Sequence, residues 1–187
     1  LKVIEEFNPL HTLWNLALDW LNANTSWLDL PFNQIKPDTL SMFISRATKS
    51  IAKLKKELLP HPVLIDKVLI PLSAQIDKFK LSLPLITKLR HPGINSKHWK
   101  LISDAVGFTV APTTETTLQE FLNLDLGRWN VQISEIASVA AQEYNIESAL
   151  EQMNDELQQT NIITQEFKDT NNYIMIGADD LISMIDD

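Results

Sequence analysis

The chain has 187 residues, of which 44% are hydrophobic, and it carries a formal net charge of −8. This length and apolar content can bury a core, as one domain or as two small helical subdomains, and they exclude a disordered tail. The lack of cysteine excludes disulfides and cysteine-rich zinc sites, and the short apolar runs exclude a membrane-spanning helix, which needs about 20 apolar residues.

The charge is unevenly distributed along the chain. Residues 1–110 hold 14 Lys/Arg against 9 Asp/Glu, a net charge of +5, whereas residues 111–187 hold 2 against 15, a net charge of −13. The basic half is too weakly charged to indicate a nucleic-acid surface. The asymmetry instead favours either the orientation of a charged partner or attraction between the two halves.

The first predicted helix covers residues 4–24, where apolar residues recur at helical spacing. It is apolar on more than one side, so we expect it to pack between neighbours or against a partner. Trp14, Trp20 and Trp27 are interpreted as core aromatics, because they offer large contact areas that favour burial.

The second predicted helix runs from Asp38 to Leu59, after a loop bracketed by Pro31 and Pro37. One of its faces is apolar, and the opposite face carries four aligned cations: Arg46, Lys49, Lys53 and Lys56. Such a stripe is usually a solvated face, but it is also a candidate surface for an acidic partner. Both interpretations stay open.

Prolines delimit the next two predicted helices. The third helix covers residues 62–79, and Pro71 inside it predicts a kink near Lys67, because proline removes a helical hydrogen bond. A separate short helix is predicted at residues 82–90, with Pro84 in its first turn, where proline is well tolerated.

The stretch LRHPGINSKHWKLI, residues 89–102, brings two histidines, a tryptophan and a Pro-Gly pair into fourteen positions. The histidines are seven residues apart across a turn, and no nearby carboxylate is spaced to complete a metal site. The stretch is therefore interpreted as a joint between two helices.

Each part of this joint has a predicted role. Arg90 favours the C-terminal end of one helix, and Gly93 is expected to supply a left-handed or open backbone. Asn95 or Ser96 is expected to cap the next helix, and Trp99 to face the core.

Further helix ends are predicted after the joint. Gly107 ends the helix, and residues 108–116 form a loop. Thr117 and Glu120 form a capping box, T-x-x-E, ahead of a short helix that Gly127 interrupts.

The remainder of the chain changes from a helical to an alternating pattern. Two helices are predicted at residues 129–143 and 146–160, with Asn145 as the N-cap between them. A β-hairpin follows, formed by NIITQEFK and NYIMIG around DTNN, and a last short helix begins near Ala178.

The predicted fold class is mainly α: an elongated array of about seven to eight helices with one short β-hairpin near the C-terminus. Two subdomains are expected, a helical one at residues 1–110 and a helical pair with the hairpin at residues 111–187. Because the chain opens on Leu1 rather than Met, we interpret it as a fragment of a much longer polypeptide.

No constellation of residues indicates catalysis, cofactor binding or metal binding. The four glycines are isolated, so no phosphate-binding loop is present, and neither H-E-x-x-H nor G-x-S-x-G occurs. The sequence therefore predicts no catalytic, cofactor-binding or metal-ligating residue.

Four blocks of the sequence, in order, resemble the N-terminal part of the linker region of dynein heavy chains, and they cover nearly the whole chain. The blocks are PLHTLWNLALDWLNANTSWLDLPFNQI, IDKFKLSLPLITKLRHPGINSKHWKLI, LNLDLGRWNVQISEIASVAAQEYNIESALEQM and YIMIGADDLISMIDD. The form W-L-D-x-P-F-x-x-I is more similar to axonemal than to cytoplasmic dyneins. Pro71 and the run HPVLIDKVLIP depart from the family pattern and leave the geometry of the third helix open.

The resemblance implies a mechanical function. The linker is a mostly helical arm lying across a ring of AAA+ ATPase modules, and its bending converts nucleotide-driven changes of the ring into movement along microtubules. On this basis the segment is not itself an enzyme, and ATP and Mg belong to the parent chain. The implied partners are the AAA+ ring, the upstream tail with its associated dynein chains, and microtubules, with no nucleic acid or membrane. The implied location is the cytoplasm and cytoskeleton, in the axoneme of a cilium or flagellum.

Two other hypotheses remain open at this stage. The first is a helical protein-protein interaction adaptor, unrelated to motors, that uses the basic and acidic faces. The second is an enzyme with a dispersed site.

Overall fold

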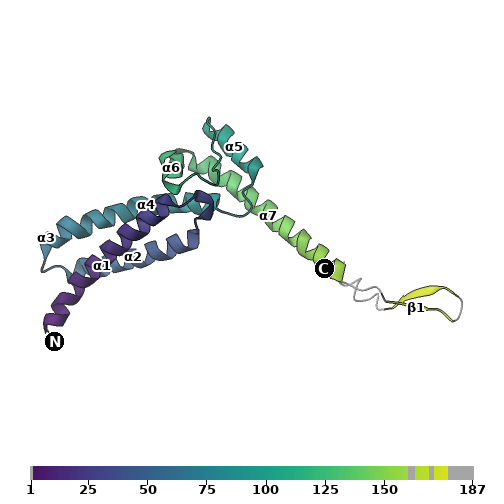
Figure 1. Cartoon of the computed structure of the whole chain (residues 1–187), viewed down its shortest axis with the longest axis horizontal. Helices are drawn as coiled ribbons and strands as arrows, with labels where there is room; N and C mark the ends of the chain where they lie inside the picture. Colours follow the sequence, from purple (N-terminus) through teal and green to yellow (C-terminus); the bar gives the residue numbers. More distant parts are fainter. Residues whose placement is uncertain (1, 160–162, 169–170, 177–187) are drawn as a thin grey trace. The chain divides into compact units, whose positions relative to one another are not determined.

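A computed structural model describes residues 2–159, 163–168 and 171–176. This part of the chain is mainly α-helical, with one antiparallel β-hairpin near the C-terminus, which confirms the predicted fold class (Figure 1). It contains six α-helices of six residues or more, slightly fewer than predicted. They are α1 (Lys2–Asp29), α2 (Pro37–Glu57), α4 (Ile70–Leu89), α5 (Ser96–Val106), α6 (Leu118–Asn123) and α7 (Asn130–Gln159).

The chain forms two compact units, Leu1–Ala141 and Gln142–Asp187. The subdomain boundary expected after residue 110 falls inside the first unit, because Leu118, Phe121 and Ile133 join the same buried cluster as the N-terminal helices. The last predicted helix, from about Ala178, lies outside the described residues.

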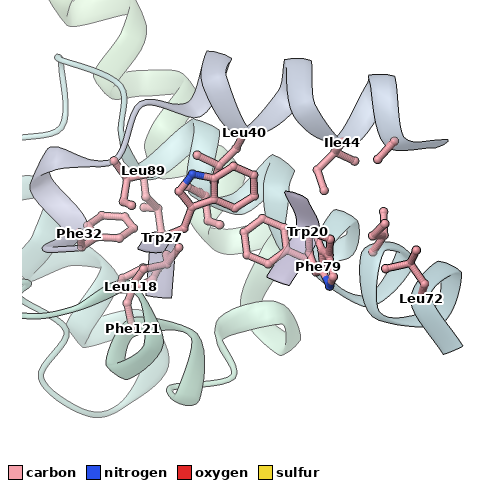
Figure 2. Close-up of a cluster of buried hydrophobic side chains, with 14 of the residues drawn as sticks. Trp20, Trp27, Phe32, Leu40, Ile44, Leu72, Phe79, Leu89, Leu118 and Phe121 are labelled. Atoms are coloured by element: carbon pink, nitrogen blue, oxygen red, sulfur yellow. The ribbon is translucent and has the colours of Figure 1, made fainter. Parts of the chain in front are cut away.

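Aromatic rings from α1 and α4 lie beside aliphatic side chains of α2 in the buried cluster of the first unit (Figure 2). The ring of Trp27 packs edge-on against Phe43 of α2, with centroids 5.2 Å apart. Trp20 packs edge-on against Phe79 of α4 at 5.7 Å, and its indole N–H donates a hydrogen bond to Gln75 Oε1 at 3.0 Å. The interpretation of Trp20 and Trp27 as core residues is therefore confirmed.

The other face of α1 is exposed. The exposed side chains include a tryptophan that was predicted to lie in the core, and they share one side of the helix: Phe7, Trp14, Leu18 and Leu21. The prediction for Trp14 was wrong, since 55% of its surface is exposed. The stripe was visible in the sequence as a helix that is apolar on more than one side.

A π-helical segment lies where the third predicted helix was expected to be irregular. The short helix α3 (Pro62–Leu64) passes into the π-helical segment η2 (Ile65–Leu69), and α4 then begins at Ile70. Pro71 follows this segment within an unbroken helical stretch, since Leu69 and Ile70 both have α-helical backbone angles, and its missing N–H removes one hydrogen bond to the preceding turn. The π-helical segment includes Lys67, the position at which the sequence predicted a kink.

The break predicted at Ser82 is absent, and α4 continues through Pro84 to Leu89. Buried residues lie on one face of the helix both before and after the proline, as Phe79 and Ile86 show. Continued burial of this face offsets the cost of the hydrogen bond that proline removes, about 3 kcal/mol. The prediction of two separate helices was wrong for this reason.

The two helices predicted at residues 129–143 and 146–160 are one helix, α7. Asn145 is therefore not an N-cap but a residue in the helix interior. No glycine or proline occurs between Asn130 and Gln159, and asparagine costs at most about 0.7 kcal/mol relative to alanine inside a helix. The prediction of two separate helices with a cap at Asn145 was therefore wrong.

The predicted hairpin is confirmed as strands β1 (Ile163–Glu166) and β2 (Tyr173–Ile176). The strands are antiparallel, and their register pairs Ile163 with Ile176 and Glu166 with Tyr173. Next to the last pair, the Phe167 N–H donates to the Asn172 carbonyl at 2.8 Å.

In the described part of the chain, no helix has the length and apolar content needed to cross a membrane.

Candidate functional site

The predicted basic face lies on α2, opposite the side that packs into the core. Leu40, Ile44, Ala47, Ile51 and Leu54 are buried on one side of the helix. The four predicted cations are all exposed on the other side: Arg46, Lys49, Lys53 and Lys56. We call these four residues the basic face. Proline is favourable in the first turn of a helix, where Pro37 lies. The helix dipole is stabilised by the negative charge of Asp38 in that turn and by the positive charge of the lysines in the last turn.

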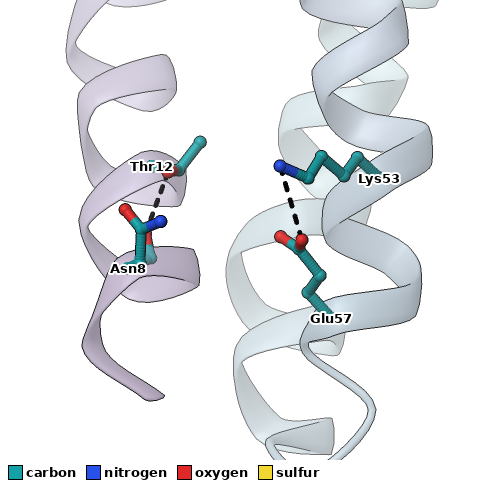
Figure 3. A network of polar contacts seen from close by, with 4 residues as sticks. All are labelled: Asn8, Thr12, Lys53 and Glu57. Atoms are coloured by element: carbon teal, nitrogen blue, oxygen red, sulfur yellow. Dashed lines mark hydrogen bonds and ion pairs between the residues drawn. The ribbon is translucent and has the colours of Figure 1, made fainter. Parts of the chain in front are cut away.

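Two members of the basic face already have acidic neighbours. Arg46 Nη2 lies 4.0 Å from Asp19 Oδ2 of α1. Figure 3 shows the other pair, in which Lys53 Nζ lies 3.5 Å from Glu57 Oε1 one turn along α2. Among the described residues, neither Lys49 nor Lys56 has a carboxylate partner. Because exposed pairs contribute at most about 1 kcal/mol, the face stays available to a more acidic surface.

The predicted joint begins at Arg90, the residue that ends α4. Its Nε–H donates a hydrogen bond to the Ile35 carbonyl at 3.0 Å, and its guanidinium lies 6.0 Å from the ring centroid of Phe32. Burial lowers the pKa of Arg90, because removal of water disfavours the charged form. Arg90 therefore ties the end of α4 to the loop before α2, a contact that the sequence did not predict.

Gly93 does not have the left-handed backbone considered for it, since Gly107 is the glycine with positive φ in the described residues. Gly93 is buried, and its N–H donates to Nδ1 of His91 at 3.1 Å. This local bond closes the turn without a left-handed residue, so the left-handed one of the two predicted alternatives for Gly93 is excluded.

Asn95 is the N-cap of α5, and Ser96 is the first residue of that helix. The Asn95 side chain accepts a hydrogen bond from the Lys97 N–H at 3.2 Å, and His98 Nδ1 accepts from the Asn95 N–H at 3.2 Å. The helix ends at Gly107, whose φ is 84°, as the glycine signal predicted. Of the two predicted caps, Asn95 is the correct one.

Replacing Asn95 with Ala should lower the free energy of unfolding by about 1 kcal/mol, because α5 loses the side-chain half of its cap. Urea unfolding followed by circular dichroism measures the loss. Asn95→Ser should restore most of it, since serine is also a good N-cap. Equal stability of the wild type and Asn95→Ala would contradict the role of this cap.

Trp99 lies half-buried at the edge of a second aromatic group. Its ring lies edge-on to Phe32 at 6.3 Å and to Phe121 at 6.4 Å, and Phe32 stacks on Phe121 at 4.0 Å. The backbone adds two hydrogen bonds here, from the Phe32 N–H to the Thr116 carbonyl and from the Leu118 N–H to the Leu30 carbonyl. Trp99 therefore packs against the core, as expected. Its ring partners, Phe32 and Phe121, come from segments far from it in the sequence.

Phe121, which contacts both Phe32 and Trp99, lies on α6 just after a capping box that the sequence predicted. Thr117 Oγ1 accepts from the Glu120 N–H at 3.2 Å, and Glu120 Oε2 accepts from the Thr117 N–H at 3.0 Å. This box starts α6 and so places Phe121 on Phe32. Sequence reasoning missed Phe32 and Phe121 as joint residues, although the P-F of W-L-D-x-P-F was a visible signal.

The described side chains form no arrangement suited to metal chemistry. No group of three or more His, Asp or Glu residues in residues 2–159, 163–168 and 171–176 could hold a metal ion. His98 is buried and belongs to the cap of α5. What the arrangement offers is a charged surface on α2 and a joint in which Arg90 and Trp99 connect four segments.

Comparison with known proteins gives consistent matches along the chain. The family described as "Dynein heavy chain, N-terminal region 2" matches residues 1–187. Dynein axonemal heavy chain 1 of Rattus norvegicus and that of Homo sapiens are each 32% identical over 186 residues, covering 100% of this chain and 4% of the relative. Dynein axonemal heavy chain 3 of Mus musculus is 27% identical over 182 residues, covering 96% of this chain and 4% of the relative.

The fold and its surfaces define a mainly helical segment with an aromatic core. The family match over all 187 residues makes the assignment specific: the chain belongs to the dynein heavy chain family, in its N-terminal region 2. The resemblance predicted from the sequence is confirmed, and the relatives are axonemal heavy chains by name. The chain spans about 4% of the length of these relatives.

Proposed function

We propose that this chain is part of the linker of an axonemal dynein heavy chain and acts as a mechanical lever arm. The observation that carries the proposal is the match of the dynein N-terminal region to the whole chain. The arm would transmit ATP-driven changes of the AAA+ ring into movement along microtubules, within the axoneme of a cilium or flagellum. Its partners would be the ring of the same heavy chain and the upstream tail with its dynein chains.

The packing of the first unit supports a role in transmitting force. Three long helices, α1, α2 and α4, share one aromatic centre in which Trp20 and Trp27 each contact two further rings. Close packing of this kind has low compressibility and transmits strain. The joint adds a second connected group, because Phe32, Trp99 and Phe121 link the loop before α2 to α5 and α6.

We further propose that the segment performs no catalysis, and that ATP and Mg bind elsewhere in the parent chain. The proposal follows from the lack of a phosphate-binding loop or a catalytic motif in the sequence. Nucleic acid is not among the proposed partners, since the basic half has a net charge of only +5. A membrane is not among them either, since the apolar runs are far shorter than the roughly 20 residues of a spanning helix.

Loosening the arm should uncouple ATP turnover from movement. In the full-length heavy chain, we expect Leu89→Ala to slow microtubule gliding several-fold while microtubule-stimulated ATP turnover is largely retained. Leu89 is 2% exposed on α4, and its truncation leaves a cavity that costs about 2–5 kcal/mol and softens the core. Gliding velocity and ATP turnover of the same preparation measure the two quantities.

Leu81→Ala is the matched control, because Leu81 lies on the same helix but is 82% exposed. It should leave both gliding and ATP turnover unchanged. If Leu89→Ala lowers the two activities in equal proportion, or changes neither, the lever-arm proposal fails.

Family membership overturns the adaptor as a protein unrelated to motors, but its basic face gives a second candidate function within the heavy chain, the docking of an acidic partner. Among the described residues, Lys49 and Lys56 have no carboxylate partner, which favours this function. On this proposal, the basic face binds an acidic partner. Reversing Lys49, Lys53 and Lys56 to Glu should abolish a salt-sensitive complex while the helical circular dichroism signal is retained, because all three side chains are exposed. Pull-down from axonemal extract at low and high salt, with wild-type and reversed chains, measures the difference.

Replacing the same three lysines with Arg is the control, since it keeps the charge and should keep the complex. Unchanged binding of the Glu variant would reject the basic face as a docking surface. Such a result would leave the lever-arm test unaffected, because that test depends on the core.

A further inference from the structure

The part of α7 that lies in the second unit has an exposed apolar stripe. Four residues spaced by four, three and four positions share one side of the helix, and each keeps about half or more of its surface exposed: Ile146 62%, Leu150 60%, Met153 53% and Leu157 47%. This spacing is that of the a and d positions of a coiled-coil seam. Large apolar side chains in a continuous row indicate an interaction surface.

The surroundings of the stripe are strongly acidic. Residues 142–159 contain five Asp/Glu and no Lys or Arg. Helical geometry places Glu147 and Glu156 at the positions that border the stripe, the e and g positions of a heptad, and Asp155 on the opposite side. The stripe is therefore bordered by acidic residues on a stretch of helix that contains no Lys or Arg.

The charge decides which occupant the stripe can accept. A second copy of the same helix would place two stretches with five Asp/Glu and no Lys or Arg side by side, and this net like charge opposes pairing. A helix with apolar residues at the same spacing and Lys or Arg beside them would cover the stripe and neutralise its borders. The apolar residues extend along about 16 Å of helix, which corresponds to about three turns of a partner.

We propose that the stripe of α7 is a docking site for a basic amphipathic helix of the same heavy chain, from sequence outside residues 1–187. The chain spans about 4% of the length of its relatives, so most of the parent polypeptide lies outside the structure. Covalent connection gives such a helix a high effective concentration at α7. The inference depends on family membership and goes beyond the lever-arm proposal.

Zero-length carbodiimide coupling of the full-length heavy chain tests the proposal, because it joins a carboxylate to an amine in direct contact. Mass spectrometry should find Glu147 and Glu156 coupled to lysines of one amphipathic helix outside residues 1–187, and Asp155 not coupled to it. Leu150→Glu together with Met153→Glu should reduce this coupling to background. Glutamate is a good helix former, so these exposed substitutions keep α7 helical.

Glu151→Gln is the matched control, since it removes one charge outside the bordering positions and should leave the coupling unchanged. Coupling to lysines of residues 1–187, to a second copy or to a different polypeptide would overturn the proposal. So would an absence of coupling, or coupling that survives the double substitution. None of these results changes the expected uncoupling by Leu89→Ala, so the two proposals fail separately.

Discussion

Replacing Trp27 with Ala should lower the free energy of unfolding by about 3–5 kcal/mol. The indole is buried and packs against Phe43 at 5.2 Å, Phe79 at 5.6 Å and Trp20 at 6.4 Å. Truncation removes all three ring contacts, and it leaves a cavity between three helices that cannot close without moving one of them. Urea unfolding of the 187-residue chain, followed by circular dichroism, measures the change.

Trp14→Ala is the control for this prediction, since Trp14 is the same residue type on the same helix and is 55% exposed. Its truncation should cost less than about 1 kcal/mol in the isolated chain. The comparison therefore reports which face of α1 packs in the core. Equal losses for the two variants, or a larger loss for Trp14→Ala, would mean that α1 is rotated from the orientation described above.

Local signals predicted the helix ends well, because the groups that satisfy a helix end lie within a few residues of it. Thr117 with Glu120, Asn95 and Gly107 all act as caps at the positions that their sequence pattern indicated. The signals for the hairpin also lie close together in the sequence, since the alternation of side chains and the turn residues between them define both strands. Such features depend little on the rest of the chain.

Signals for helix interruption were less reliable, because tertiary packing decides whether a weak breaker is tolerated. Pro84 was predicted to begin a new helix, yet the buried face of α4 continues past it to Leu89. Asn145 was predicted to cap a helix, yet nothing near it prevents α7 from continuing. At Pro84 the buried contacts of α4 outweigh a local preference of a few kcal/mol, whereas at Asn145 the local preference is itself below about 1 kcal/mol.

The sequence predicted which residues of the candidate site are charged and on which side of α2 they lie, but it did not predict the contacts between distant segments. The basic face follows from helical spacing alone, so Arg46, Lys49, Lys53 and Lys56 were placed correctly on one side of α2. The hydrogen bond from Arg90 to the Ile35 carbonyl and the stacking of Phe32 on Phe121 join segments far apart in the chain. No periodicity encodes such pairs, and a single sequence offers no other signal for them.

Replacing Ile146 with Pro should disrupt α7 at a cost of about 3 kcal/mol or more. In a continuous helix, the N–H of residue 146 bonds to the carbonyl four residues earlier, and proline removes this bond and clashes with the preceding turn. If Asn145 were instead an N-cap, residue 146 would be the first helical position, where proline is favourable. The substitution therefore has opposite consequences for one helix and for two.

Amide hydrogen exchange around residues 140–150, together with the helical circular dichroism signal, measures this effect. Ile146→Pro should lower protection on the N-terminal side of the substitution and reduce the helical signal. Ile146→Ala is the matched control: the side chain is 62% exposed, so its loss costs little in the isolated chain, and alanine favours the helix. Unchanged protection in the proline variant would mean that the chain turns at Asn145, and the stripe of α7 would then lie on a shorter helix with a capped start.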